Sequence, residues 1–121
     1  MELTIITPDG EHKVEFNMKI VVIESPYAGN VPNNIQYARK CLLDSLRRGE
    51  APFASHLLYT QCLCDLNSVE RELGILAGFQ FRRVASLTAV YTDFGISHGM
   101  QLGIDDAKKI NQRIEYREIN H

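Results

Sequence analysis

Three polar segments of this 121-residue chain follow apolar runs, and their side chains are of types that recognise small molecules. A tyrosine offers a flat apolar face with a polar tip that stacks on a base or sugar. A histidine titrates near neutral pH and serves as acid, base or hydrogen-bond donor. A serine and a glycine at a helix start present free amides to an anion. The candidate ligand-binding residues are Ser25, Pro26, Tyr27, Ala28 and Gly29, then Ser55, His56 and Tyr59, and finally Asp93, Ser97, Gly99 and Met100.

Several of these residues also have a purely structural interpretation. Ser97 is a routine helix cap, and a lone histidine such as His56 is more often structural than functional. Asp93 follows a predicted strand, where an acidic residue orients a ribose hydroxyl or simply forms a turn. Tyr27 lies in a loop rich in proline and glycine, and it is the aromatic residue that we most expect at the site.

The catalytic residue, if there is one, stays unknown at this stage. Glu24, Glu70 and Asp93 are the candidates, although nothing in the sequence places any of them correctly for catalysis. Glu70 also suits a helix-capping role, because it follows Asn67 by three positions. Glu72 and Asp105 are further carboxylates that nothing in the sequence places at the site.

The familiar cofactor motifs are missing from the sequence. Neither G-x-G-x-x-G nor G-x-x-x-x-G-K-S/T occurs, so a classical dinucleotide site and a P-loop are not expected. Residues 95–99 spell the G-x-S-x-G nucleophile elbow, but an α/β-hydrolase needs a far longer chain. Cys62 and Cys64 form C-x-C, which is not the paired C-x-x-C of structural zinc sites. We therefore predict neither a metal nor a cofactor.

The elements that must position these residues are recognisable from their patterns. Continuous β-branched runs predict strands buried on both faces, and apolar residues three and four apart predict helices. Gly74 and Gly78 lie four apart on one predicted helix, where small residues let another backbone approach closely. The predicted elements are a hairpin of Leu3–Ile6 and Lys13–Phe16, a strand Lys19–Ile23, a loop 24–32, a helix from Pro32 to Leu46 capped by Gly49, a strand Pro52–Ser55, a connection Leu57–Asp65, a helix from Asn67 to Val84, a strand Leu87–Thr92, a helix from Ser97 to Ile110, and an edge strand Arg113–Ile119.

This order predicts a single α/β domain over residues 1–121. After the N-terminal hairpin (1–17), strands and helices alternate, and right-handed crossovers assemble such units into a parallel sheet. We expect a three-layer α/β/α architecture with a mostly parallel, flavodoxin/Rossmann-like sheet of about four core strands. In such sheets ligands bind beyond the carboxyl ends of the strands, where all three polar segments should lie.

Composition limits the partners and the compartment. The net charge is −2 with scattered Lys and Arg, so a nucleic-acid polymer is not an expected partner. The first residues carry Asp9, Glu11, His12 and Lys13, and no apolar run is long enough for a bilayer, so neither a signal peptide nor a membrane association is expected. Three cysteines without a secretion signal indicate reduced thiols, and we expect a cytoplasmic protein.

The segments KIVVIESPYAGN, ASHLLYTQ and VYTDFGISHGMQLGIDDA suggest a family. Over residues 19–119 the chain resembles small bacterial and phage proteins related to the nucleoside 2-deoxyribosyltransferase superfamily. The resemblance implies a nucleotide-like pocket and a homodimer or higher homo-oligomer. Characterised members cleave or exchange N-glycosidic bonds through a Glu nucleophile in an S-x-G-x-x-x-E segment. Ser97 and Gly99 match that segment, but the position of the Glu is Gly103.

Three hypotheses follow from a superfamily-like pocket without its nucleophile. The leading one is binding or sequestration of a nucleotide-derived small molecule, in the setting of a phage protein acting on host nucleotide metabolism, signalling or defence. The second is an N-glycosidic hydrolase or transferase with a relocated carboxylate, for which Glu24, Glu70 or Asp93 is the candidate. The third is a protein interaction module with a vestigial pocket.

Overall fold

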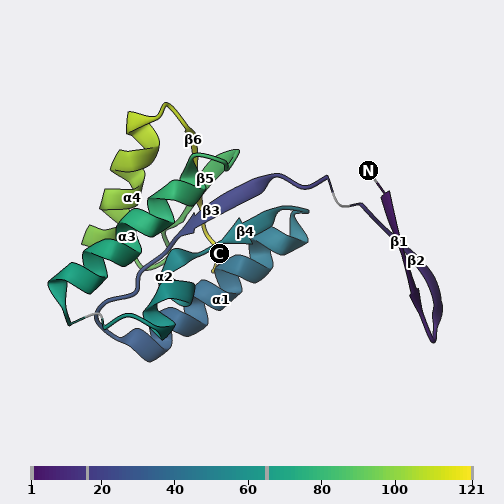
Figure 1. Ribbon diagram of the computed structural model, residues 1–121, viewed down its shortest axis with the longest axis horizontal. Helices are drawn as coiled ribbons and strands as arrows, with labels where there is room; N and C mark the ends of the chain where they lie inside the picture. Colours follow the sequence, from purple (N-terminus) through teal and green to yellow (C-terminus); the bar gives the residue numbers. More distant parts are fainter. Residues whose placement is uncertain (1, 16, 65, 121) are drawn as a thin grey trace.

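A computed structural model describes residues 2–15, 17–64 and 66–120 of the chain (Figure 1). It contains a hairpin followed by alternating strands and helices, as the sequence predicts. The elements are β1 (Glu2–Thr7), β2 (Gly10–Glu15), β3 (Ile20–Glu24), α1 (Val31–Arg47), β4 (Ala51–Phe53), α2 (Ser55–Leu58), the 3₁₀ turn η1 (Tyr59–Gln61), α3 (Ser68–Arg82), β5 (Leu87–Tyr91), α4 (His98–Lys109) and β6 (Arg113–Arg117).

The central sheet has four parallel strands in the order β4-β3-β5-β6. The two inner strands carry the apolar runs: Val21, Val22 and Ile23 are at most 3% exposed, and all five residues of β5 are buried. From β3 the chain moves outward to β4 on one side and then to β5 and β6 on the other. The strand order therefore reverses between β3 and β5, which is the switch point where doubly wound sheets bind ligands.

Helices cover both faces of the sheet, which confirms the predicted three layers (Figure 1). On one face, Tyr37 and Cys41 of α1 pack with Val21, Ile23 and other strand residues in the larger core cluster. On the other face, buried residues of α4 pack against Val90 of β5 in a second cluster. The apolar side chains of the strands are thus removed from water on both sides, which is the main source of stability for such a sheet.

The helices begin and end where the sequence provides capping groups. Asn30, Asn67 and Ser97 each accept a hydrogen bond from an amide in the first turn of the following helix. Gly49 follows α1 with a φ of +81°, the left-handed conformation predicted for it. These caps fix the residues at which α1, α3 and α4 begin.

The N-terminal hairpin projects from the α/β layers (Figure 1). β1 and β2 pair antiparallel from Glu2↔Glu15 to Thr7↔Gly10, and within the described residues they form a sheet of their own. Phe16, predicted to end the second strand, lies outside the described residues. The hairpin contributes nothing to the carboxyl edge of the main sheet.

The segment after β4 differs from the prediction. The strand ends at Phe53, and Ser55 and His56 lie in the short helix α2 rather than at a strand end. The predicted connection of residues 57–65 continues α2 and forms η1, while Asp65 lies outside the described residues. A strand of three residues has too little pattern to show where it ends. The short helix that follows is stabilised by packing of α2 against α3, which offsets the cost of ordering a single helical turn.

Within the described residues, no helix is both long and apolar enough to cross a membrane.

Candidate functional site

A cleft of about 1020 Å³ lies at the carboxyl edge of the sheet, beside the switch point. Its walls come from the end of β3 and the following loop, from α2 and η1, and from α3 and α4. Tyr27, His56 and Ser97, from the three polar segments, all line it. The topology therefore brings Tyr27 and Ser97 to the same cleft, although they are 70 positions apart in the sequence.

Most of the candidate residues line this cleft, and a few do not. Pro26, Gly29 and Asp93 are not among its lining residues. Those that do line it are Ser25, Tyr27, Ala28, Ser55, His56, Tyr59, Ser97, Gly99 and Met100, together with the carboxylates Glu24, Glu70, Glu72 and Asp105.

Asp93 makes structural contacts outside the cleft. Its carboxylate accepts hydrogen bonds from the Tyr37 hydroxyl (2.5 Å) and from the backbone amides of Ile119 and Asn120. Desolvation opposes ionisation of Asp93, but these hydrogen bonds outweigh it and lower the pKa. Asp93 therefore fastens the chain after β6 to the α1 face of the sheet, and it does not line the cleft.

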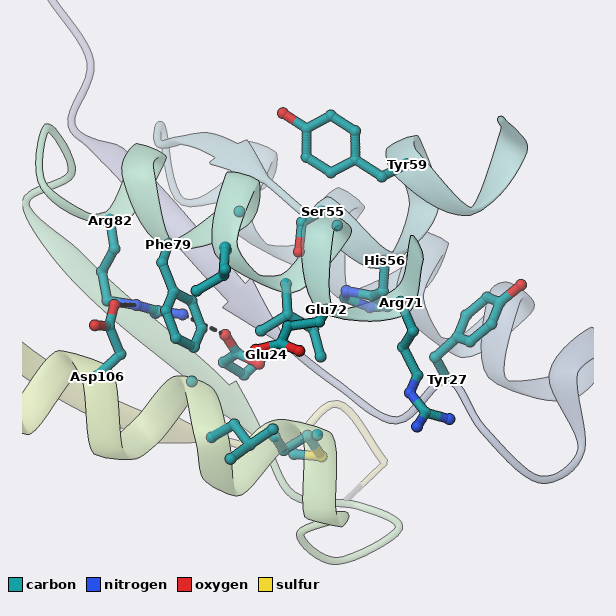
Figure 2. A pocket seen from close by; sticks show the side chains of 18 of the residues that line it. Glu24, Tyr27, Ser55, His56, Tyr59, Arg71, Glu72, Phe79, Arg82 and Asp106 are labelled. Atoms are coloured by element: carbon teal, nitrogen blue, oxygen red, sulfur yellow. Dashed lines mark hydrogen bonds and ion pairs between the residues drawn. The ribbon is translucent and has the colours of Figure 1, made fainter. Parts of the chain in front are cut away.

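Glu24 places a carboxylate at the floor of the cleft. It is the last residue of β3, and its Oε2 accepts a hydrogen bond from Arg82 Nη2 at 2.7 Å (Figure 2). Among the described residues, none donates a hydrogen bond to Oε1. Burial raises the pKa of Glu24 to about 7, although Arg82 acts in the opposite direction. A carboxyl group with this pKa in a cleft is suited to proton transfer near neutral pH.

The Glu24 carboxylate occupies the space beside Gly103 of α4. A Cβ atom added to Gly103 would overlap with the carboxylate carbon and both oxygens of Glu24. Glycine at this position is therefore required by the close approach of a side chain from β3, not by the local conformation of the helix.

Arg82 holds this carboxylate from the last turn of α3. It is 2% exposed, and it also donates to Asp106 of α4 (Nε to Oδ2, 3.0 Å) and to Thr88 of β5 (Nη1 to Oγ1, 2.6 Å). Asp106 is shared with Arg83. This network joins α3, α4, β3 and β5 behind the cleft, and it gives Glu24 a single position.

Ser25 and His56 form a second polar pair on the cleft wall. The Ser25 hydroxyl and His56 Nε2 are 2.7 Å apart, and Ser25 is 5% exposed. Burial lowers the pKa of His56 to about 4, so the imidazole is neutral at physiological pH. A neutral imidazole offers one donor and one acceptor nitrogen, and the other nitrogen is left to serve a ligand.

The two tyrosines differ in how they face the cleft (Figure 2). Tyr27 lies at its mouth, beside the Arg71 side chain, which comes from the first half of α3. The Tyr59 ring is turned away from Glu24, and it packs edge-on against Phe53 with ring centroids 6.4 Å apart. Tyr27 is therefore the better stacking platform, as the sequence indicated, and Tyr59 forms an outer wall.

Comparison with known families gives one match. The model of a domain of unknown function, DUF7768, matches residues 19–117, which is most of the chain. The chain belongs to the DUF7768 family. The match excludes the hairpin and includes every residue that lines the cleft. No curated protein matches the chain significantly.

The close contact of α3 with α2 in this DUF7768 domain depends on the two glycines singled out in the sequence. A Cβ on Gly78 would lie 2.8 Å from Ser55 Cβ and Oγ, and one on Gly74 would lie 3.2 Å from Leu63 Cδ1. The prediction that both positions allow a close approach is confirmed. Ser55 is thereby held in a contact with α3, although it also lines the cleft.

The other candidates in this DUF7768 domain have assigned contacts. Ser97 Oγ accepts from the Met100 amide at 3.2 Å, so the serine caps α4 as predicted, and the Met100 side chain is buried in the core. Glu70 Oε1 accepts from the Cys64 amide at 3.3 Å. Glu72 and Asp105 line the cleft from exposed positions. Each remains available to a ligand only in part.

The chemistry of the described residues offers no metal centre. Residues 2–15, 17–64 and 66–120 contain no group of three His, Cys, Asp or Glu side chains arranged to hold an ion. The three cysteines are free thiols, with Cys41 buried and the other two exposed.

Sequence reasoning missed Arg71 and Arg82. Both are arginines of α3 on the helix face that lines the cleft, together with Ile75 and Phe79. Arg82 stands among the apolar residues of that face, and a charge within an apolar stripe was the signal that could have identified it. Arg71 follows Glu70 and precedes Glu72, which made the segment look like an ordinary solvated surface.

Proposed function

We propose that this DUF7768 domain binds a nucleotide-derived small molecule in the cleft. The observation that carries the proposal is the convergence of Tyr27, the Ser25–His56 pair and Glu24 on one cleft at the switch point of a parallel sheet. Ligands of open α/β sheets bind at this place, where loops and helix amino termini meet.

The character of the walls supports the proposal. A volume of about 1020 Å³ is at the upper end of the pockets that enclose small organic ligands. The cleft combines apolar walls, including Phe79 and Met100, with a few polar groups held by the fold. An aromatic platform beside hydrogen-bonding groups is the combination that recognises a base and a sugar.

The test is a binding screen with purified protein against nucleosides, nucleotides and cyclic nucleotides. We expect one or more of these compounds to raise the melting temperature and to give a saturable calorimetric titration. Tyr27→Ala should weaken binding by about tenfold, the size expected for loss of one stacking contact. Tyr116→Ala is the matched control, because Tyr116 is exposed on β6 and does not line the cleft. Indifference to every compound would sink the proposal and leave an interaction module with a vestigial pocket.

A second candidate function is cleavage of an N-glycosidic bond. The observation that favours it is the Glu24 carboxylate in the cleft beside Gly103, with Oε2 bonded to Arg82 and, among the described residues, no hydrogen bond to Oε1. In this reaction Oε1 bonds to the anomeric carbon while the carbon–nitrogen bond breaks, and the base leaves with the electron pair and takes up a proton. Water then displaces Glu24 and releases the free sugar.

The second candidate is tested by incubation with the same compounds and chromatographic detection of the released base. Glu24→Gln keeps an oxygen for the Arg82 hydrogen bond but removes the nucleophile, so we expect product formation to fall by at least about a thousandfold. Saturable binding without any base release by the wild-type protein excludes catalysis and leaves binding or sequestration. Retained turnover in Glu24→Gln would show that another group performs the reaction.

The biological setting and the assembly state remain predictions. A phage origin and an action on host nucleotide metabolism, signalling or defence rest on the resemblance alone. Self-association is tested by sedimentation, where a monomer at all accessible concentrations would contradict it.

A further inference from the structure

The cleft contains one cationic side chain beside the tyrosine platform. Arg71 lines the cleft, its side chain is exposed, and Figure 2 shows the guanidinium beside Tyr27. In the same view Arg82 lies at the other end, beyond Glu24. The two arginines of α3 therefore flank the cleft from opposite ends.

Their ionic partners differ. Arg82 and Arg83 are held by Glu24 and Asp106, so their charges are already compensated within the fold. Among the described residues, no carboxylate forms an ion pair with Arg71, and no hydrogen bond is made by its guanidinium. A guanidinium without a partner at a ligand cleft is an available site for an anion.

Arg71 has two acidic neighbours, Glu70 and Glu72, and among the described residues neither forms an ion pair with it. The Glu70 carboxylate accepts a hydrogen bond from the amide of Cys64, in the connection before α3. Lys109 is the other cationic cleft residue without an ion pair among the described residues, but it lies in the last turn of α4, far along that helix from Ser97. The uncompensated charge nearest the aromatic platform is thus that of Arg71.

We infer that Arg71 binds a phosphate group, and that the ligand of the cleft is a nucleoside monophosphate and not a nucleoside. This inference rests on the proposed function and names the class of ligand. The planar guanidinium donates two parallel hydrogen bonds to phosphate oxygens, which gives both affinity and orientation. With the phosphate at Arg71, the nucleoside extends past Tyr27 toward Glu24.

The experiment compares the four common deoxynucleosides with their 5′-monophosphates and with inorganic phosphate, by calorimetry at low ionic strength. We expect at least one monophosphate to bind about tenfold or more tightly than its nucleoside, the effect of one charge-assisted contact. Arg71→Ala should abolish this preference, and Arg71→Lys should retain part of it. Arg39→Ala is the matched control, since Arg39 is an exposed arginine of α1 outside the cleft.

The outcomes separate this inference from the proposed function. Nucleoside binding without a preference for the monophosphate, or a preference that survives in Arg71→Ala, overturns the role of Arg71 and leaves the proposed function standing. If inorganic phosphate binds as tightly as the monophosphates, Arg71 binds free phosphate, and the inference that the ligand is a nucleotide is wrong. Failure of every nucleoside and nucleotide to bind overturns the proposed function, and this inference with it.

Discussion

The two buried arginines of this domain, Arg117 and Arg82, are used in opposite ways on the two faces of the sheet. Arg117 is 5% exposed and donates to both oxygens of Glu50, each at 2.8 Å. Arg82 is 2% exposed, but it donates to only one oxygen of Glu24. Arg117 thus occupies both oxygens of Glu50, whereas Arg82 leaves one oxygen of Glu24 without a hydrogen bond among the described residues.

The titration of the two carboxyl groups reflects this difference. The hydrogen bonds from Arg117, with a further one from Ser45, lower the pKa of Glu50 despite its partial burial. Burial raises the pKa of Glu24 to about 7, because its single partner does not offset the loss of water. A bidentate ion pair stabilises the fold, while an incomplete one keeps a carboxyl group ready for a ligand or a proton.

The largest expected effect is the loss of Arg117. Arg117→Met should lower the free energy of unfolding by about 3 to 5 kcal/mol, because Glu50 remains buried without its cation. At pH about 6, Arg82→Met should lower the free energy of unfolding by less than Arg117→Met does, because Glu24 is then mostly protonated and carries no unpaired charge. Above pH about 7, where Glu24 ionises, the losses in the two variants should become more alike. Urea denaturation measures both variants.

Arg113→Ala is the control for the ion-pair variants, because Arg113 is an exposed arginine of the same strand as Arg117. Its contact with Glu115 is solvent-exposed, so its removal should change stability by at most about 0.5 kcal/mol. If Arg117→Met and Arg82→Met lowered the free energy of unfolding equally, both at pH about 6 and above pH about 7, the two ion pairs would not differ as proposed.

The next effect concerns pH. Between its ordinary pKa of 4.5 and about 7, Glu24 binds more protons in the folded protein than in the unfolded chain. Its contribution to stability is therefore complete at low pH and is lost as the pH rises through 7. Relative to Glu24→Gln, the wild-type protein should lose about 2 kcal/mol between pH about 5 and about 8.

The pH comparison is made by urea denaturation of both proteins at the two pH values. Subtracting Glu24→Gln removes the opposite dependence of His56, whose lowered pKa costs stability as the pH falls from 6.5 toward 4. A difference between the two proteins that does not vary with pH would mean that Glu24 is ionised throughout, like Glu50.

The smallest expected effect tests the space that Glu24 occupies. Gly103→Ala introduces a Cβ that overlaps with the Glu24 carboxylate, so it should lower the free energy of unfolding by about 1 to 3 kcal/mol. Gly99→Ala on the same helix is the matched control, because its Cβ meets nothing within 4 Å. The control should be neutral or slightly stabilising in thermal denaturation. Equal behaviour of the two variants would mean that Glu24 moves aside at no cost.

Much of the fold was predictable because its signals are local. The run from Val21 to Ile23 is apolar and β-branched, and β5 is apolar except for Thr88. The helix caps Asn67 and Ser97 directly precede residues with helical spacing. The strand β4 was harder, because three residues carry too little pattern to distinguish Ser55 in a strand from Ser55 in a helix.

The site was predictable only in its location. Parallel strands end at one edge, so the segments of Tyr27, His56 and Ser97 had to meet near it, and they do. The partners of the charged residues were not predictable, because Asp93 and Tyr37 are 56 positions apart and Glu24 and Arg82 are 58 apart.

By itself, then, the sequence determined the order of strands and helices, their caps and the edge of the sheet at which polar residues gather, because these follow from local periodicity and chain chirality. Only the tertiary structure decided that Asp93 bonds to the chain after β6 and that Glu24 fills the space beside Gly103. It also decided that Arg71 has no ion pair among the described residues. These outcomes depend on which side chains meet across the fold, and a hydrogen bond between distant residues leaves no periodic trace in the sequence.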